Sequence, residues 1–394
     1  MSKINSWPFY EKECIEKVSE ILSSGKVNYW TGFEGKYFEK EAAKIFDTKY
    51  SIALANGSVA LSCAYKSLGL KKNDEIITSP RTFLATSSSA VLLGVKPIFA
   101  DVDLDSGCIT CESIEPLITK KTKAISVVHL GGWPANMAKI IDMAKSYGIK
   151  VIEDCSQAHG AKIKTSEGFK SVGSFGDIGT WSFCQDKIIT TGGEGGMVTT
   201  SNKELWDTMW SYKDHGKDFN EVNRNDHPPG YRWLHNNFGT NYRLTEMQSA
   251  IGRYQLKNLE KWNKKRTLNA SNIIERISSL ICVRVPYIPK NLVHGWYKLH
   301  VYLKDEYLKE NWNRDRVIHE INLRGFPAFQ GSCSEIYLEK CFRDNNLIPK
   351  KILKNAKKLG KSSLMFQIHP TITNEQINQY SETIYKVLKT ACKH

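Results

Sequence analysis

The sequence predicts an α/β protein with a mainly parallel sheet, followed by a smaller α+β domain. Two observations lead to this fold class. Between residues 50 and 154, short apolar runs rich in β-branched residues alternate with helical stretches, which is the pattern of βαβ units. Residues 263–394 instead combine strands with basic amphipathic helices. We therefore expect a large domain over residues 1–262 and a small domain over residues 263–394.

The large domain is predicted to begin with two helices. Residues 11–23 and 35–46 carry apolar side chains at helical spacing. Five strands then alternate with helices over 58–68, 84–93 and 136–147. The predicted strands cover residues 50–55, 75–78, 97–102, 124–129 and 150–154.

The rhythm of the sequence changes near Gly176. Two strands joined by a glycine-rich turn are expected there, and a long helix follows them. The small domain is expected to contain one clear strand and two basic helices. These later elements cover residues 180–183 and 196–200 (strands), 243–264 (helix), 296–303 (strand), and 350–359 and 374–391 (helices).

Composition indicates a globular chain with excess positive charge. Of its 394 residues 41% are hydrophobic and 24% charged, and 55 Lys+Arg against 41 Asp+Glu give a net charge of +14. Such a charge suits anionic ligands, and a nucleic-acid-binding module is one alternative. The basic residues are spread in short doublets such as Lys71-Lys72, which argues against nucleic acid.

The cellular compartment is predicted from two further features. The first twenty residues are polar and partly acidic, unlike a signal peptide, and no apolar run is long enough to span a bilayer. The ten cysteines form no secreted-type cluster, and Cys108-Ile-Thr-Cys111 has no second pair at zinc-site spacing. We therefore expect unpaired thiols, no metal site, no membrane contact and a cytoplasmic protein.

Polar residues follow several of the predicted strands. Ligands of open α/β sheets bind at the carboxyl ends of the strands. Gly57 and Ser58 follow the first strand and open a helix, as an anion site or an ordinary serine cap. Phe83 follows the second strand, to stack on a flat ligand or to pack in the core. Asp154 ends the fifth strand beside Glu153, to pair with a cationic ligand nitrogen or to act as a solvated or capping residue.

Lys187 is the most informative of these residues. It lies between an aromatic strand and the run Gly-Gly-Glu-Gly-Gly at 192–196, which lacks the spacing of a nucleotide-binding fingerprint. A lysine held in a desolvated pocket loses its proton more easily and can form a Schiff base. An anion-binding helix start, a stacking aromatic, a carboxylate and such a lysine together make up the binding inventory of pyridoxal phosphate (PLP).

The sequence also resembles a known family, the DegT/StrS nucleotide-sugar aminotransferases, which are fold-type I PLP enzymes. The resemblance runs from about Tyr29 to Leu256 and continues more weakly to the C-terminus. It implies the fold-type I architecture, with a large PLP-binding domain that includes an N-terminal helical arm. The matching segments are 56–61, 80–86, 127–132, 152–161, 173–177, 182–187, 193–198 and 238–246.

The resemblance implies a role for each matching side chain. Lys187 would form the Schiff base with the cofactor, Asp154 would bind the pyridinium nitrogen, and Gln157 would contact the ring's phenolic oxygen. Phe83 would lie against the ring. The remaining implied contacts are to the phosphate from Gly57, Ser58 and Ser182, to the partner subunit's phosphate from Asn241, and to the sugar from His215. The Asn241 contact implies a homodimer with active sites at the interface.

The reaction implied by the resemblance is amino transfer from L-glutamate to a nucleotide-linked keto sugar, for bacterial polysaccharide or lipopolysaccharide synthesis. The preferred acceptor is a 4-keto-6-deoxy hexose, with a UDP-linked 2-acetamido sugar as one form. The alternatives are a 3-keto acceptor and a PLP-binding regulator or inactive homologue. Lys187 favours transamination, because some relatives with histidine there are dehydratases. Ser58, where threonine is more usual, and the unusual segment 327–337 are departures from the family pattern.

Overall fold

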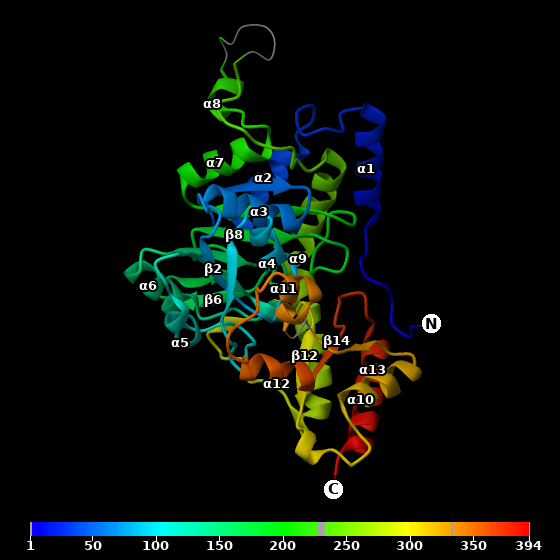
Figure 1. Cartoon of the computed structure of the whole chain (residues 1–394). Coiled ribbons are helices and arrows are strands. Elements are labelled where there is room, and N and C mark those ends of the chain that lie inside the picture. The colour runs from blue at the N-terminus through cyan, green and yellow to red at the C-terminus, as the bar shows by residue number, and fades with distance from the viewer. Residues whose placement is uncertain (1, 225, 227–232, 332–334, 394) are drawn as a thin grey trace.

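A seven-stranded sheet forms the centre of the large domain (Figure 1). The computed structural model describes residues 2–224, 226, 233–331 and 335–393. The strand order is β1-β9-β8-β5-β4-β2-β3, and β9 is antiparallel to both of its neighbours while the other pairs are parallel. This confirms the predicted mainly parallel sheet. The strands are β1 Tyr50–Leu54, β2 Glu75–Thr78, β3 Lys96–Phe99, β4 Thr122–Val128, β5 Lys150–Asp154, β8 Ile178–Ser182 and β9 Gly196–Thr200.

Helices cover both faces of this sheet, because successive strand residues point to opposite sides. Ile76 and Ile152 pack with α3 and α7 on one face. Ile77 and Val151 pack with α6 on the other face. The helices of the large domain are α1 Lys12–Ser24, α2 Glu34–Ile45, α3 Gly57–Ser67, α4 Ala85–Val91, α5 Cys111–Ile114, α6 Met137–Ser146, α7 Lys203–Lys213 and α8 Phe219–Val222.

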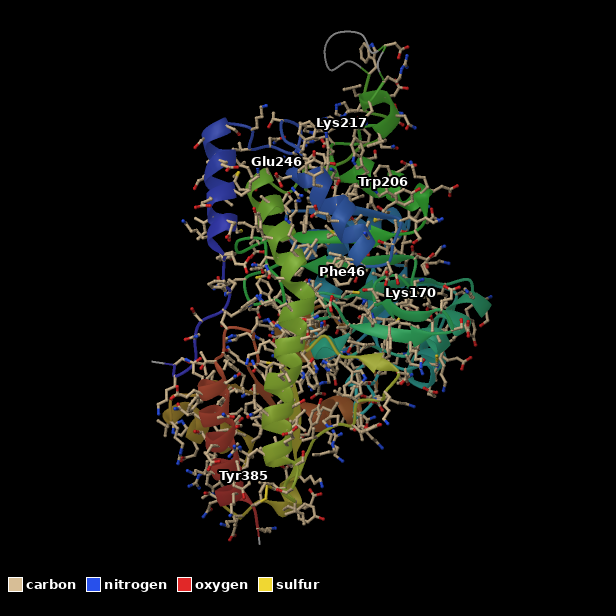
Figure 2. The ribbon with its side chains drawn as sticks, turned by 180° about the vertical axis from the view of Figure 1, so that it is seen from behind. Phe46, Lys170, Trp206, Lys217, Glu246 and Tyr385 are labelled. Atoms are coloured by element: carbon tan, nitrogen blue, oxygen red, sulfur yellow. A yellow bond between two sulfur atoms is a disulfide. The ribbon has the colours of Figure 1, made fainter. Side chains whose placement is uncertain are left out.

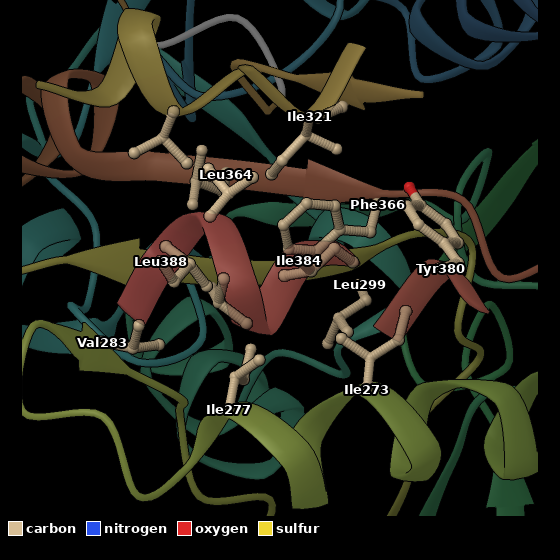
Figure 3. Packing of buried hydrophobic residues seen from close by; sticks show 14 of the residues in the cluster. Ile273, Ile277, Val283, Leu299, Ile321, Leu364, Phe366, Tyr380, Ile384 and Leu388 are labelled. Carbon is tan, nitrogen blue, oxygen red and sulfur yellow. The ribbon is translucent and has the colours of Figure 1, made fainter. Parts of the chain in front are cut away.

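The long helix α9 (Glu246–Ile277) joins the two parts of the chain (Figure 2). It begins at a capping box in which the Thr245 hydroxyl accepts the Gln248 backbone N–H. The helix extends beyond the predicted end at residue 264, so the expected domain boundary at 262/263 falls inside it. Near its end, Ile273 and Ile277 lie in the core of the small domain (Figure 3).

The small domain is built on a four-stranded antiparallel sheet of order β10-β12-β14-β13. Helices α9 and α13 pack beside it around Leu299, Leu364 and Ile384 (Figure 3). This confirms the predicted α+β class, the strand near residues 296–303 and the last helix. The elements are β10 Val283–Arg284, β12 Leu299–Leu303, α10 Arg314–Leu323, β13 Ala328–Phe329, α11 Lys340–Asp344, α12 Lys354–Ser362, β14 Ser363–Phe366 and α13 Asn374–Ala391.

Two features of the fold differ from the expectations. A small three-stranded sheet was not predicted; it consists of β6 Lys162–Thr165, β7 Gly168–Ser171 and β11 Leu292–Val293. The expectation of unpaired thiols is wrong for Cys282 and Cys392, which form a disulfide with their Cα atoms 5.6 Å apart. The sequence separation of 110 hides this pairing from sequence reasoning, because only the packing of α13 against α9 brings the two together. Cys108 and Cys111 are free, as expected. In the described part of the chain, no helix is long and apolar enough to cross a membrane.

Candidate active site

A cavity of about 690 Å³ lies at the carboxyl ends of the central strands. Its wall contains seven of the nine residues predicted for the site: Gly57, Ser58, Phe83, Asp154, Gln157, Ser182 and Lys187. They come from the start of α3, from the segment after β2, and from the ends of β5 and β8. The rule that ligands bind where parallel strands end therefore locates this cavity correctly.

The start of α3 forms one end of the cavity. The Asn56 side chain caps the helix by accepting the Val59 N–H at 3.0 Å. Gly57 and Ser58 come between these two residues, at the helix end that favours anions. A Cβ on Gly57 would lie 2.6 Å from the Cβ of Ser182, so glycine is what lets α3 approach the end of β8. The two serine hydroxyls thus lie beside a helix start that can hold a phosphate.

Asp154 supplies a carboxylate on another wall of the cavity. The residue is only 4% exposed. Oδ2 accepts a hydrogen bond from the Thr86 hydroxyl at 2.8 Å, and Oδ1 accepts the Ser156 N–H at 3.1 Å. These bonds fix the carboxylate within the lining of the cavity, where it can meet a cationic nitrogen of a ligand.

The neighbouring acid Glu153 has a structural role instead. It is fully buried and accepts hydrogen bonds from His129 Nε2 and from the N–H groups of Gly173, Phe175 and Gly176. Burial raises its pKa, but the bonds from His129 and the backbone amides outweigh burial and hold the pKa below its usual value. His129 Nδ1 accepts the Ala135 N–H, so neither ring nitrogen has a lone pair left for a metal.

Gln157 lines the cavity with a hydrogen-bonded amide, whereas Phe83 lines it with an exposed ring. The N–H of Gly131 donates to Gln157 Oε1 at 2.8 Å, which orients the amide so that its NH₂ group is available to an acceptor. Phe83 is 64% exposed, so it is a wall of the cavity and not a core residue. An exposed ring at this position can cover a flat ligand.

Lys187 lies on the loop after β8, and its side chain is 15% exposed. Its backbone carbonyl accepts the Trp7 indole N–H at 2.8 Å, so the N-terminal arm holds this loop. The glycine-rich turn supports the same loop from the other side. Gln185 N–H donates to the Gly193 carbonyl at 2.9 Å, and Gly193 has a φ of +123°, which side-chain-bearing residues rarely adopt.

Among the described residues of the small domain, four also line the cavity, and sequence reasoning missed them: Tyr297, His300, Gly331 and Met365. His300 and Met365 are paired across β12 and β14, so the small-domain sheet closes this side of the cavity. Burial and the nearby charges of Arg81 and Lys298 lower the pKa of His300 to about 3, so it is neutral at physiological pH. The only available signal was the position of Tyr297 and His300 near the start of the predicted strand.

Asn241 and His215 lie elsewhere, on the surface beside one another. Asn241 forms a β-bridge with Asp214, and the His215 N–H donates to the Thr240 carbonyl at 2.9 Å. Both side chains are exposed, and the cavity wall, as far as the described residues define it, contains neither. Arg243 holds this segment in place through a hydrogen bond to the buried Asp214 at 2.6 Å.

Comparison with known proteins identifies the family. Residues 8–385 match the model of the DegT/DnrJ/EryC1/StrS aminotransferase family. The chain belongs to this family. It is 32% identical over 381 residues to GDP-perosamine synthase of Escherichia coli O157:H7, covering 96% of this chain and 97% of that protein. A UDP-N-acetyl-3-dehydro-alpha-D-glucosamine 3-aminotransferase of Acidithiobacillus ferrooxidans is 33% identical, covering 74% of this chain and 74% of that protein. A dTDP-3-amino-3,6-dideoxy-alpha-D-galactopyranose transaminase of Aneurinibacillus thermoaerophilus is 32% identical, covering 79% and 81%.

Solved structures agree with this assignment. The aminotransferase from Psychrobacter cryohalolentis is 48% identical with a TM-score of 0.95, covering 98% of this chain and 99% of that one. NtdA of Bacillus subtilis, solved with its cofactor PMP bound, is 26% identical with a TM-score of 0.81, covering 98% and 86%. The chain is therefore a PLP-dependent aminotransferase of the nucleotide-sugar type with a fold-type I architecture.

The residues of the cavity fit this cofactor. The start of α3 at Gly57, together with the hydroxyls of Ser58 and Ser182 on the same cavity wall, can hold a phosphate. The buried carboxylate of Asp154 suits a protonated ring nitrogen, and Lys187 supplies a primary amine for the aldehyde. The donor set of this chain thus matches the chemistry of PLP group by group.

Proposed function

We propose that this aminotransferase moves an amino group from L-glutamate to a 4-keto-6-deoxy hexose carried on a nucleoside diphosphate. The observation that carries the amino-transfer part of the proposal is the convergence of Lys187, Asp154 and the start of α3 on one cavity. The net charge of +14 is favourable for an anionic acceptor. A 3-keto acceptor is the second candidate, because two relatives bear names of that kind.

When bound, PLP supplies the aldehyde that receives the amino group and a ring that takes up electrons. In our proposal Asp154 keeps the ring nitrogen protonated, and Gly57, Ser58 and Ser182 bind the phosphate. Gln157 donates to the phenolic oxygen and Phe83 covers the ring. Lys187 Nζ takes a proton from the donor carbon and returns one to complete the transfer, as a general base and then a general acid.

We also propose a homodimer in which each subunit completes the other's site. Asn241 and His215 lie side by side on the surface, outside the cavity of their own chain. In a two-fold dimer, such a segment can reach the partner's cavity, where Asn241 would bind the phosphate and His215 the sugar. The proposed dimer thus accounts for the separation of these two residues from the other seven.

The direct test is the absorbance spectrum of the PLP-loaded protein before and after L-glutamate. We expect a visible band that bleaches as glutamate donates its nitrogen. Lys187→Arg, which keeps the charge but has no primary amine, should abolish the bleaching, whereas Lys203→Ala on the surface should not. A loaded protein whose band ignores glutamate would favour another donor or a regulatory role. A folded protein without any band would contradict the cofactor site itself.

The acceptor is tested with a matched pair of substrates. Nucleotide-linked 4-keto-6-deoxy and 3-keto hexoses are offered to the aminated protein, and recovery of the visible band is followed. Faster recovery of the visible band with the 4-keto sugar supports the proposal. Faster recovery with the 3-keto sugar would contradict the 4-keto assignment and favour a 3-keto acceptor.

A further inference from the structure

The amine of Lys187 has a carboxylate neighbour that its proposed role does not use. Asp186 Oδ1 lies 3.9 Å from Lys187 Nζ. The other oxygen, Oδ2, accepts a hydrogen bond from the hydroxyl of Tyr297, which belongs to the small domain. Lys187 Nζ also lies 5.0 Å from the centre of the Tyr297 ring. All three residues line the same cavity.

We propose that Asp186 and Tyr297 act as one positioning pair that holds a negative charge beside the Lys187 amine. This rests on the proposed function, in which Lys187 carries a proton between two carbon atoms. While Nζ carries that proton it is an ammonium, and an adjacent carboxylate stabilises the charged form. Tyr297 restricts the carboxylate to one orientation, although the Asp186 side chain itself is 55% exposed.

The backbone around Tyr297 is fixed on both sides. Its N–H donates to the Gly131 carbonyl at 3.0 Å, and its carbonyl accepts from the buried Arg266 at 3.3 Å. Gly131 is also the residue that orients Gln157. The backbone of Tyr297 is therefore held by the same turn that orients Gln157, which makes Tyr297 a rigid support for Asp186.

The charges around the pair explain why a carboxylate is needed here. Lys298 Nζ lies 4.7 Å from the Tyr297 ring centre, and the charge of Arg266 acts on both Tyr297 and Asp186. Burial lowers the pKa of Lys298 to about 8, an effect that Asp186 opposes. Burial alone would raise the pKa of Asp186, but the Lys187 charge and the Tyr297 hydroxyl lower it, so the carboxylate is ionised at neutral pH. Without Asp186, the Lys187 amine would face these cations with no opposing charge from the pair.

The test uses the full chain without cofactor, together with the loaded enzyme. Lys187 in the cofactor-free protein is acetylated at pH 8, and its labelling rate is followed by mass spectrometry. Acetylation requires the neutral amine, and the Asp186 carboxylate favours the charged form of Lys187. Lys187 should therefore be acetylated about fivefold faster in Asp186→Asn than in the wild type, which is the factor expected for removing a unit charge about 4 Å away in water. In the loaded enzyme, kcat with glutamate should fall by about the same factor with KM unchanged.

Tyr297→Phe keeps the ring and removes the hydroxyl, so it tests the positioning part of the inference. It should speed labelling by a smaller factor and have no further effect in the Asp186→Asn background, where there is no charge left to orient. Asp207→Asn, which removes a carboxylate paired with Lys203 on the surface, is the matched control and should leave Lys187 labelling unchanged.

Equal labelling of the wild type and Asp186→Asn would overturn the inference, as would an equal effect of Tyr297→Phe in both backgrounds. If Asp186→Asn does not fold, Tyr297→Phe alone decides, because an unchanged labelling rate in it contradicts the pair. A wild-type enzyme that ignores glutamate would instead refute the proposed function, while the labelling of the cofactor-free protein would still decide whether the pair exists.

Discussion

Replacing Gly57 by alanine should damage both the stability and the cofactor affinity of this enzyme. The new Cβ would lie 2.6 Å from the Cβ of Ser182, whereas ordinary carbon contacts are at about 3.5 Å or more. The start of α3 must therefore move away from the end of β8 by about 1 Å. Such overpacking costs about 1–3 kcal/mol of unfolding free energy. The same shift would separate the helix start, including Ser58, from the Ser182 hydroxyl that we propose binds the same phosphate.

Urea denaturation and PLP titration measure the two effects. We expect Gly57→Ala to lose about 1–3 kcal/mol and to bind PLP at least about tenfold more weakly. In the Gly57→Ala background, Ser182→Gly should restore part of the stability because it removes the clashing Cβ, and Ser182→Ala should not. Wild-type stability and wild-type PLP affinity in Gly57→Ala would refute the close approach of α3 to β8.

Three further predictions concern other parts of the molecule. Glu153→Gln should lower the unfolding free energy by roughly 3 kcal/mol at pH 7, because it removes a buried, fully hydrogen-bonded carboxylate. The pKa of Glu153 is below its usual value, so the stabilisation by its carboxylate is lost as pH falls below about 4. Urea denaturation should therefore show the difference in unfolding free energy between wild type and variant narrowing below that pH, and a constant difference would contradict this. Cys392→Ser should lower the unfolding free energy by roughly 2–5 kcal/mol, because the disulfide with Cys282 closes a long loop. Equal urea-denaturation midpoints of the wild type with and without reductant would argue against the disulfide. Lys187→Ala and Asn241→Ala chains, each impaired alone, should regain about a quarter of wild-type activity when they are mixed in equal amounts. Half of the dimers are then mixed, and each mixed dimer holds one intact site and one doubly impaired site. No regain of activity on mixing would place Asn241 outside the partner's site.

Much of the fold follows from local sequence patterns. The βαβ rhythm over residues 50–154 predicts the order and approximate limits of five strands, because buried parallel strands need continuous apolar runs and their crossovers need helices. The two-residue strands and the short hairpin at 162–171 were missed, since they carry too few apolar residues to stand out. The end of α9 was also misplaced, because tertiary packing of Ile273 and Ile277 in the small domain extends the helix beyond its apparent boundary.

The residues of the site also fall into those that could be predicted from the sequence and those that could not. Residues at or shortly after the ends of strands, such as Asp154 and Lys187, could be found because strand ends converge at one edge of the sheet. Phe83 was ambiguous from sequence and its exposure decides that it is a wall of the cavity. Tyr297 could not be found, because it reaches the cavity only after α9 has brought the small domain back over the large one. We propose that Asn241 acts in the site of a second chain, and a single sequence does not contain that geometry.

The central claim is that Lys187 is the residue that bonds to PLP. It is tested most directly by reducing the PLP-loaded protein with borohydride, digesting it, and locating the retained cofactor by peptide mass spectrometry. We predict one modified peptide, with the adduct on Lys187, and no adduct there in Lys187→Arg. An adduct on a different lysine, or none after reduction of a loaded protein, would contradict the assignment of this cavity as the catalytic site.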